Sequence, residues 1–270
     1  MTDLLSIAES VARSAADLAF ERRTEGVEIT MTKSTVTDVV TAADADVEQL
    51  VLRRIRQLRP DDGILGEEGT SVDGTTGITW VVDPIDGTVN YLYGLDGYAV
   101  SIAAVEGPTR VEELRAESWT GLAAAIVAPA SGAVYTAAAG KGASLNGQSI
   151  RASAADSMAS ALVATGFGYD PGRRSRQGAA VAQLLPKVRD IRRLGAAALD
   201  LAMCGAGRLD AYFEKGIRPW DVAAGLLIAA EAGCVTHIED AGGELFAAVA
   251  APGIAEELFA SLEHIGAAKA

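Results

Sequence analysis

The stretch Trp80-Val81-Val82-Asp83-Pro84-Ile85-Asp86-Gly87-Thr88 decides the architecture that we predict for this chain. Its apolar, β-branched beginning is typical of a buried strand. Pro84 cannot donate to a sheet ladder, so we expect the strand to end and the chain to turn there. Asp83 and Asp86 would then emerge together at the end of the strand, just before a glycine and a threonine that begin a new element.

The two carboxylates of this stretch have two interpretations. Held this close, they repel each other unless a cation lies between them. Oxygen ligands suit Mg²⁺, which takes one or two carboxylates and completes its shell with water and substrate phosphate. The same string is also ordinary turn chemistry, because Asp caps, Pro restricts φ and Gly tolerates positive φ. Taken alone, the stretch leaves both interpretations open.

Length and composition indicate a folded chain with a sizeable core. The chain has 270 residues, of which 49% are hydrophobic and 22% charged, which excludes a disordered protein. We expect a single domain over 1–270, with an α+β half at about 1–147 and an α/β half at about 148–270. The formal net charge of −13 disfavours nucleic acid or an anionic membrane as a partner. A phosphorylated substrate remains compatible if bound cations reverse the local field.

Targeting and redox signals are weak. No basic segment precedes an apolar run at the N-terminus, and no uncharged apolar stretch reaches the roughly 20 residues of a membrane span. Cys204 and Cys234 are too few for a disulfide framework and lack metal-ligand spacing. We therefore expect a cytoplasmic protein with buried thiols and no membrane partner.

The first half is expected to begin with an amphipathic helix from Leu4 to Ala19, followed by an extended segment that carries Lys33 outward. Lys33 is interpreted as a surface residue, with a phosphate-facing role as the alternative. Thr41 and Asp44 have capping-box spacing before a helix that reaches Leu58. Asp44 is explained by the helix dipole, and the alternative is that it orients a water or hydroxyl.

A short strand at residues 64–65 leads into Glu67 and Glu68, of which at most one should serve a site shared with Asp83. Loop solvation explains both glutamates equally well. Further buried strands are expected at 98–105, 122–127 and 133–138, the last two joined as a hairpin.

The second half alternates strands and helices, which favours layered sheets and helices. Strands are expected at 162–165, 191–194, 209–213 and 234–238, and helices at about 178–188, 197–204, 222–231 and 255–262. Arginines accumulate between residues 173 and 193, and a solvated helix face is favoured over anion recruitment. Asp221 falls in the first turn of a helix, where an acid is common for dipole reasons.

Taken together, these pieces resemble the inositol monophosphatase family of lithium-sensitive, magnesium-dependent phosphatases. The matching stretches occur in the family's order over nearly the whole chain: 40–44, 66–68, 80–90, 140–143, 146–147, 210–214 and 219–223. The resemblance implies a mixed α/β fold, the layered αβαβα sandwich of the inositol monophosphatase and fructose-1,6-bisphosphatase type. It also implies a homodimer and two to three Mg²⁺ ions in each active site.

The resemblance also implies roles for the metal-site and water-activating positions. One Mg²⁺ would be held by Glu67, Asp83 and the backbone carbonyl of Ile85, and a second by Asp83, Asp86 and Asp221, with Glu67 helping a third. Thr88 and Asp44 match the pair that orients and deprotonates the attacking water.

Further matches concern the substrate. The backbone N–H groups of Gly87 and Thr88 would cradle the phosphate, as a helix start can. Asp86, Ala197 and Glu214 match positions that contact the alcohol, and Lys33 matches a lysine of a mobile metal loop. Bound metals would activate water and stabilise the leaving alkoxide, so no protein nucleophile is needed.

Departures from the family pattern leave the substrate open. Residues 93–98 and 166–170 and Ala196 differ from the usual residues, although no metal ligand is lost. We expect myo-inositol 1-phosphate, with histidinol phosphate and fructose 1,6-bisphosphate as alternatives. A haloacid dehalogenase-like aspartyl nucleophile is disfavoured, because the acid before Asp86 stands at i−3 instead of i−2. A non-catalytic binding or regulatory protein on the same fold is the alternative of another class.

Overall fold

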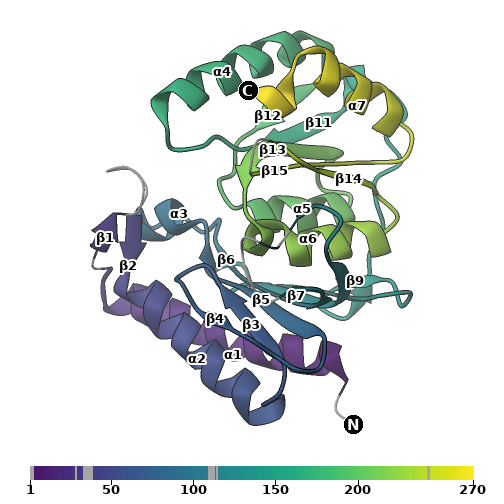
Figure 1. Cartoon of the computed structure of the whole chain (residues 1–270). Coiled ribbons are helices and arrows are strands. Elements are labelled where there is room, and N and C mark those ends of the chain that lie inside the picture. The colour runs from purple at the N-terminus through teal and green to yellow at the C-terminus, as the bar shows by residue number, and fades with distance from the viewer. Residues whose placement is uncertain (1–2, 28, 33–38, 109–112, 114, 242–243) are drawn as a thin grey trace.

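The structure is a computed structural model that describes residues 3–27, 29–32, 39–108, 113, 115–241 and 244–270. Its helices and sheets alternate in five layers, which confirms the predicted αβαβα arrangement (Figure 1). The expected strand and loop around Lys33 fall in part outside these residues, and Lys33 itself is not described.

The helices of the described chain supply the outer layers, the middle layer and one short connection. They are α1 (Leu4–Glu25), α2 (Ala42–Leu58), α3 (Thr88–Leu92), α4 (Pro171–Leu184), α5 (Ala197–Gly205), α6 (Pro219–Glu231) and α7 (Ala255–His264). None of these described helices combines the length and apolar character needed to span a bilayer.

The strands form two large sheets and one small two-stranded pair. The pair is β1 (Ile29–Thr32) and β2 (Val39–Thr41). The eight-stranded sheet contains β3 (Gly63–Gly66), β4 (Ser71–Val72), β5 (Ile78–Asp86), β6 (Ala99–Glu106), β7 (Thr120–Ala128), β8 (Ala133–Ala138), β9 (Ala143–Leu145) and β10 (Gln148–Ser149). The five-stranded sheet contains β11 (Leu162–Thr165), β12 (Asp190–Arg192), β13 (Ala211–Ile217), β14 (Val235–Asp240) and β15 (Leu245–Ala250).

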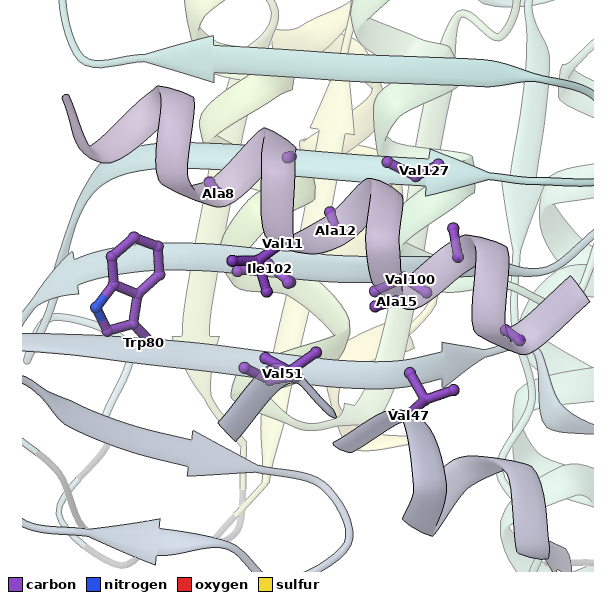
Figure 2. Packing of buried hydrophobic residues seen from close by; sticks show 14 of the residues in the cluster. Ala8, Val11, Ala12, Ala15, Val47, Val51, Trp80, Val100, Ile102 and Val127 are labelled. Carbon is purple, nitrogen blue, oxygen red and sulfur yellow. The ribbon is translucent and has the colours of Figure 1, made fainter. Parts of the chain in front are cut away.

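The larger sheet is covered on one face by α1 and α2. Its strand order is β10-β9-β8-β7-β6-β5-β3-β4, antiparallel except for the parallel pair β3 and β5. Figure 2 shows α1 lying across the strands, with Ala8, Ala12 and Ala15 turned towards Ile102 and Val100. Because alanine is small, this stripe lets the helix backbone approach the sheet closely. The buried face of α1 therefore follows the helical periodicity that the sequence predicts.

The middle layer is the pair α5 and α6, which packs between the two sheets (Figure 1). On its other side lies the smaller sheet, with order β12-β11-β13-β15-β14. The first three of these strands are parallel, and β15 runs antiparallel to both of its neighbours. Helices α4 and α7 cover the far face, where Leu184 and Leu258 are fully buried.

The predicted end of the central strand at Pro84 is wrong. Strand β5 continues to Asp86, and its register with β6 is irregular between Asp83 and Asp86. A bulge of this kind accommodates a residue that cannot donate to the ladder and turns nearby side chains to a new direction. The bulge therefore allows both acids to remain on one strand.

Two other expectations need correction. Helix α4 begins at Pro171 and not near residue 178, because the Asp170 side chain accepts a hydrogen bond from the Arg173 amide (2.7 Å) and Pro171 suits the first turn. Strand β15, which is buried along its whole length, was not predicted. Its short continuous apolar run fits a buried strand and a buried helix segment equally well, so periodicity alone does not identify it.

Candidate metal centre and active site

The parallel pair β3 and β5 brings the first two acids together. Gly66 is paired with Val82, so both strands end at the same edge of the sheet. Glu67 directly follows β3, and its amide donates to the Val82 carbonyl at 3.1 Å. Asp83, one residue further on β5, shares a side-chain hydrogen bond with Glu67. Strand pairing therefore places Glu67 beside an acid sixteen residues away in the chain.

Asp86 joins this sheet edge to the start of α5. Its carboxylate accepts hydrogen bonds from the amides of Ala197 (3.0 Å), Ala198 (2.8 Å) and Leu199 (3.4 Å). These amides belong to the first turn of the helix, which has no intrahelical acceptors for them. The predicted alcohol-contacting residues Asp86 and Ala197 are thus in direct contact.

Asp221 comes from the first turn of α6, the neighbouring helix of the middle layer. Its carboxylate accepts the Arg218 amide at 2.6 Å, and the predicted place of Asp221 in the first turn is confirmed. The carbonyl of the preceding residue, Trp220, accepts the Ser101 hydroxyl of β6 at 3.5 Å. The start of α6 is therefore tied to the same sheet that carries Asp83 and Asp86.

The charges of these acids destabilise one another. Burial is the largest cause that raises the pKa of Asp83 well above its ordinary value, followed by the charges of Glu67, Asp86 and Asp221. The pKa of Asp221 is likewise raised well above its ordinary value by burial and then by Glu67. Burial raises the pKa of Asp86 to about 7, against the lowering effect of the α5 amides. Such a site favours a bound cation, which would relieve the repulsion.

Asp44 is buried at the start of α2, where the predicted capping box with Thr41 is confirmed. Its Oδ2 accepts both the amide (2.7 Å) and the hydroxyl (2.5 Å) of Thr41. Its Oδ1 is buried without a hydrogen-bond partner. Burial raises the pKa of Asp44 to about 7, although the Thr41 hydrogen bonds lower it. This carboxyl is therefore able to exchange a proton near neutral pH.

Gly87 and Thr88 begin α3, which packs against β2, the strand that precedes Asp44. Gly87 has φ +91°, and a Cβ there would lie 2.8 Å from the Gly97 carbonyl oxygen, so only glycine suits the position. The Thr88 hydroxyl donates to the Ile85 carbonyl at 3.1 Å. Two residues of the expected site, Thr88 and Ile85, are thus in contact with each other.

Glu214, on β13, brings a further acid from the second sheet. The Tyr212 hydroxyl donates to its Oε2 at 2.6 Å. Burial raises the pKa of Glu214, while the Tyr212 hydrogen bond and the Arg193 charge lower it. The charge of Glu214 in turn raises the pKa of Asp221, which places the two acids within electrostatic reach.

The donor set fits a hard divalent cation by its chemistry, because all the candidate ligands are oxygen atoms. Across the described ranges, however, no three His, Cys, Asp or Glu side chains approach one point closely enough to hold a metal ion as they stand. Asp86 and Asp221 instead accept protein amides, and Asp83 shares a hydrogen bond with Glu67. Metal binding would exchange some of these contacts for cation contacts.

Three buried polar residues near the acids were not singled out in the sequence: Glu48, Asp200 and Tyr212. Asp200 lies in the first turn of α5, and burial, followed by the charges of Asp86 and Glu214, raises its pKa to about 8. Glu48 could have been noticed because it follows Val47 on the apolar face of its helix, and Asp200 because it interrupts an otherwise apolar helix.

Comparison with known proteins gives consistent relatives. A sequence model described as the inositol monophosphatase family matches residues 1–266. The Inositol-1-monophosphatase SuhB of Mycobacterium tuberculosis is 45% identical, over 97% of this chain and 93% of that protein. The Nus factor SuhB of Escherichia coli is 36% identical, over 86% of this chain and 84% of that protein. A solved structure of M. tuberculosis SuhB has a TM-score of 0.80 at 43% identity and covers 98% of both chains.

The match to the family model over almost the whole chain, the identity to these relatives and the shared fold agree with the motifs quoted from the sequence. The chain belongs to the inositol monophosphatase family, a family of phosphoric monoester hydrolases.

Proposed function

We propose that this chain is a Mg²⁺-dependent phosphomonoesterase that hydrolyses a small phosphorylated alcohol, with myo-inositol 1-phosphate as its preferred substrate. The observation that carries the proposal is the group of acids at one sheet edge, where Asp83 is destabilised by the charges of Glu67, Asp86 and Asp221. Acids that repel one another at one site favour a bound cation, which relieves the repulsion without protonating them. The name of the M. tuberculosis relative supports the choice of substrate.

The proposed metal ligands come from this edge and from the first turn of α6. Glu67, Asp83 and the Ile85 carbonyl would hold one Mg²⁺, and Asp83, Asp86 and Asp221 a second, with Glu67 assisting a third. When bound, Mg²⁺ would acidify a water molecule and neutralise the phosphoryl oxygens.

The protein's own contribution is to orient groups and to accept a proton. Asp44 is the proposed base: its Oδ1 lacks a partner and its pKa of about 7 suits proton acceptance near neutral pH. Thr88 would orient the attacking water together with Asp44. The amides of Gly87 and Thr88 would contact the phosphate. No covalent phosphoryl-enzyme is needed, because charge stabilisation and in-line positioning supply most of the rate.

Asp86, Ala197 and Glu214 are the proposed contacts to the alcohol. The direct hydrogen bond between the Asp86 carboxylate and the Ala197 amide supports a common subsite. The carboxylates of Asp86 and Glu214 would accept hydrogen bonds from substrate hydroxyls. An inositol ring, which carries several hydroxyls, suits such a subsite.

The test is phosphate release from myo-inositol 1-phosphate, histidinol phosphate and fructose 1,6-bisphosphate, each with Mg²⁺, with EDTA and with added Li⁺. We expect release that requires Mg²⁺, is inhibited by Li⁺ and is fastest for myo-inositol 1-phosphate. If another of the three compounds is hydrolysed fastest, the proposed reaction stands and the proposed preferred substrate is wrong. Release that is unaffected by EDTA would refute the metal proposal.

A Nus-factor role is a second candidate, because relatives at 36% identity carry that name. Asp83→Asn separates the two, since it should abolish hydrolysis without removing the surface needed for binding. If Asp83→Asn restores the growth of a strain that lacks this gene as fully as the wild-type protein does, the binding role is favoured. If only the active protein restores it, hydrolysis is the function that matters.

The assembly and location of the protein are also proposals. We propose a homodimer, as expected from the family resemblance, and the molar mass in solution measured by light scattering would test it. We propose a cytoplasmic location, consistent with the free thiols of Cys204 and Cys234, and fractionation of cells that express the full gene would test it.

A further inference from the structure

Glu48 is a buried acid that the proposed chemistry does not use. It lies on α2, is only 4% exposed, and its carboxylate contacts the loop that follows β3. Oε2 accepts the Glu68 amide at 2.8 Å. Oε1 accepts the Thr70 amide at 3.2 Å and the Thr70 hydroxyl at 2.6 Å. Three donors from one short loop therefore meet a single carboxylate.

The loop that Glu48 contacts runs from Gly66 to Thr70, and Glu67 lies between these two ends. The Gly66 amide donates to the Thr70 carbonyl at 2.8 Å, which closes the turn, and the Glu67 amide donates to Val82 on β5. The Glu48 carboxylate lies directly against Gly66, where a Cβ would be 2.3 Å from Oε2. Glycine at this position is therefore required for the close approach of the carboxylate.

The candidate metal centre needs such an anchor. Without a bound cation, Glu67 shares a hydrogen bond with Asp83 but lies within reach of the repelling charges of Asp86 and Asp221. Glu67 is half-buried in a loop, and repulsion would favour its displacement towards solvent. Hydrogen bonds from backbone amides to a buried carboxylate are charge-assisted and strong enough to oppose this displacement.

We propose that Glu48 is a positioning residue that holds Glu67 at the metal centre before any metal binds; this rests on the proposed metal-dependent function. Glu48 lies one helical turn after Asp44 on α2, so the same helix supports the proposed base and the loop of a proposed ligand. Residues that orient metal ligands in this way affect metal affinity by about 10- to 100-fold when changed.

The test uses Mn²⁺ as the probe, because its binding to the full chain is measured by calorimetry and by electron paramagnetic resonance without turnover. We expect Glu48→Gln to weaken Mn²⁺ binding about tenfold, because the glutamine amide nitrogen cannot accept a backbone N–H. Glu231→Gln is the matched control. Glu231 accepts the amides of Gly140 and Gly142, both at 2.7 Å, in a turn between β8 and β9, and its replacement should leave Mn²⁺ binding unchanged.

A second variant separates positioning from charge. Thr70→Val removes the hydroxyl that donates to Oε1 but leaves the charge of Glu48 in place. We expect Thr70→Val to weaken Mn²⁺ binding about threefold, because one hydrogen bond is lost and the two amide bonds to Glu48 remain. In both variants, hydrogen exchange of the metal-free protein should be faster at the Glu68 and Thr70 amides than in the wild type.

The outcomes distinguish the two proposals. If the wild type binds no divalent cation, the proposed function fails and this inference fails with it. If the wild type binds Mn²⁺ and folded Glu48→Gln binds it equally well, only the inference fails. Weaker binding by Glu48→Gln together with normal binding and normal exchange in Thr70→Val would show that Glu48 acts by its charge and would overturn the positioning role.

Discussion

The hydrogen bond between Tyr212 and Glu214 offers a sharp test of the proposed alcohol subsite. Tyr212 is fully buried, and its hydroxyl donates to Glu214 Oε2 at 2.6 Å. Tyr212→Phe deletes only this hydroxyl and keeps the ring that fills the core. The Glu214 carboxylate would then lose the donor that holds it in one orientation.

The size of the effect follows from the type of bond. A hydrogen bond to a charged group contributes about 1.5–3 kcal/mol. Glu214 is half-buried, so a water molecule can replace part of the lost interaction, and the lower end of this range applies. About 1.4 kcal/mol corresponds to a tenfold change in rate. We therefore expect kcat/KM for myo-inositol 1-phosphate to fall about tenfold.

The assay compares myo-inositol 1-phosphate with 4-nitrophenyl phosphate, whose leaving group has no ring hydroxyls to contact Glu214. Only the first should be hydrolysed more slowly. The Tyr212 bond lowers the pKa of Glu214, so its loss raises that pKa, and the acidic limb of the pH profile should move to higher pH. Tyr135→Phe, which removes a buried hydroxyl that accepts from Arg208 at 3.3 Å, is the control. Equal losses for both substrates would refute the reasoning.

Three further predictions concern stability and the metal site. Asp62→Asn should destabilise the protein by about 2 kcal/mol, because Asp62 accepts the buried Trp80 indole N–H (2.9 Å) and pairs with Arg59 (2.7 Å). Burial raises the pKa of Asp62, but the hydrogen bonds from Arg59, Thr76 and Trp80 together outweigh it, and the pKa is lowered. The stabilisation is therefore present above the unfolded pKa of about 4 and is lost as pH falls through the lower folded pKa. The difference in melting temperature between the wild type and Asp62→Asn should therefore become smaller in acid. A difference that does not depend on pH would contradict this account. Asp83→Asn should abolish hydrolysis, and an active variant would contradict the ligand assignment. In EDTA at neutral pH the same variant should have a higher melting temperature, because the raised pKa of Asp83 shows that the folded protein disfavours its ionised carboxylate. Gly87→Ala should cost about 2 kcal/mol or more in urea unfolding, since φ is +91° and Gly97 is close; an unchanged midpoint would contradict this.

Local patterns in the sequence were enough to predict the elements around the site. The capping box of Thr41 and Asp44 and the amphipathic face of α1 depend on residues within a few turns of one helix. The motifs identified the family because several of them, each weak alone, occur together in the family's order. The continuous strand through Pro84 was not predicted, because the bulge depends on pairing with β6.

By itself the sequence determined which residues are the candidate ligands and that a layered fold would present them. Only the tertiary structure decided which partners the carboxylates of Glu67, Asp86 and Glu48 have. Glu67 meets Asp83 because β3 and β5 are parallel neighbours, and Asp86 meets the first amides of α5 across 111 residues of chain. Glu48 likewise meets the loop after β3 across 20 residues of chain. Burial and hydrogen bonding between distant segments arise from packing, which no local pattern specifies.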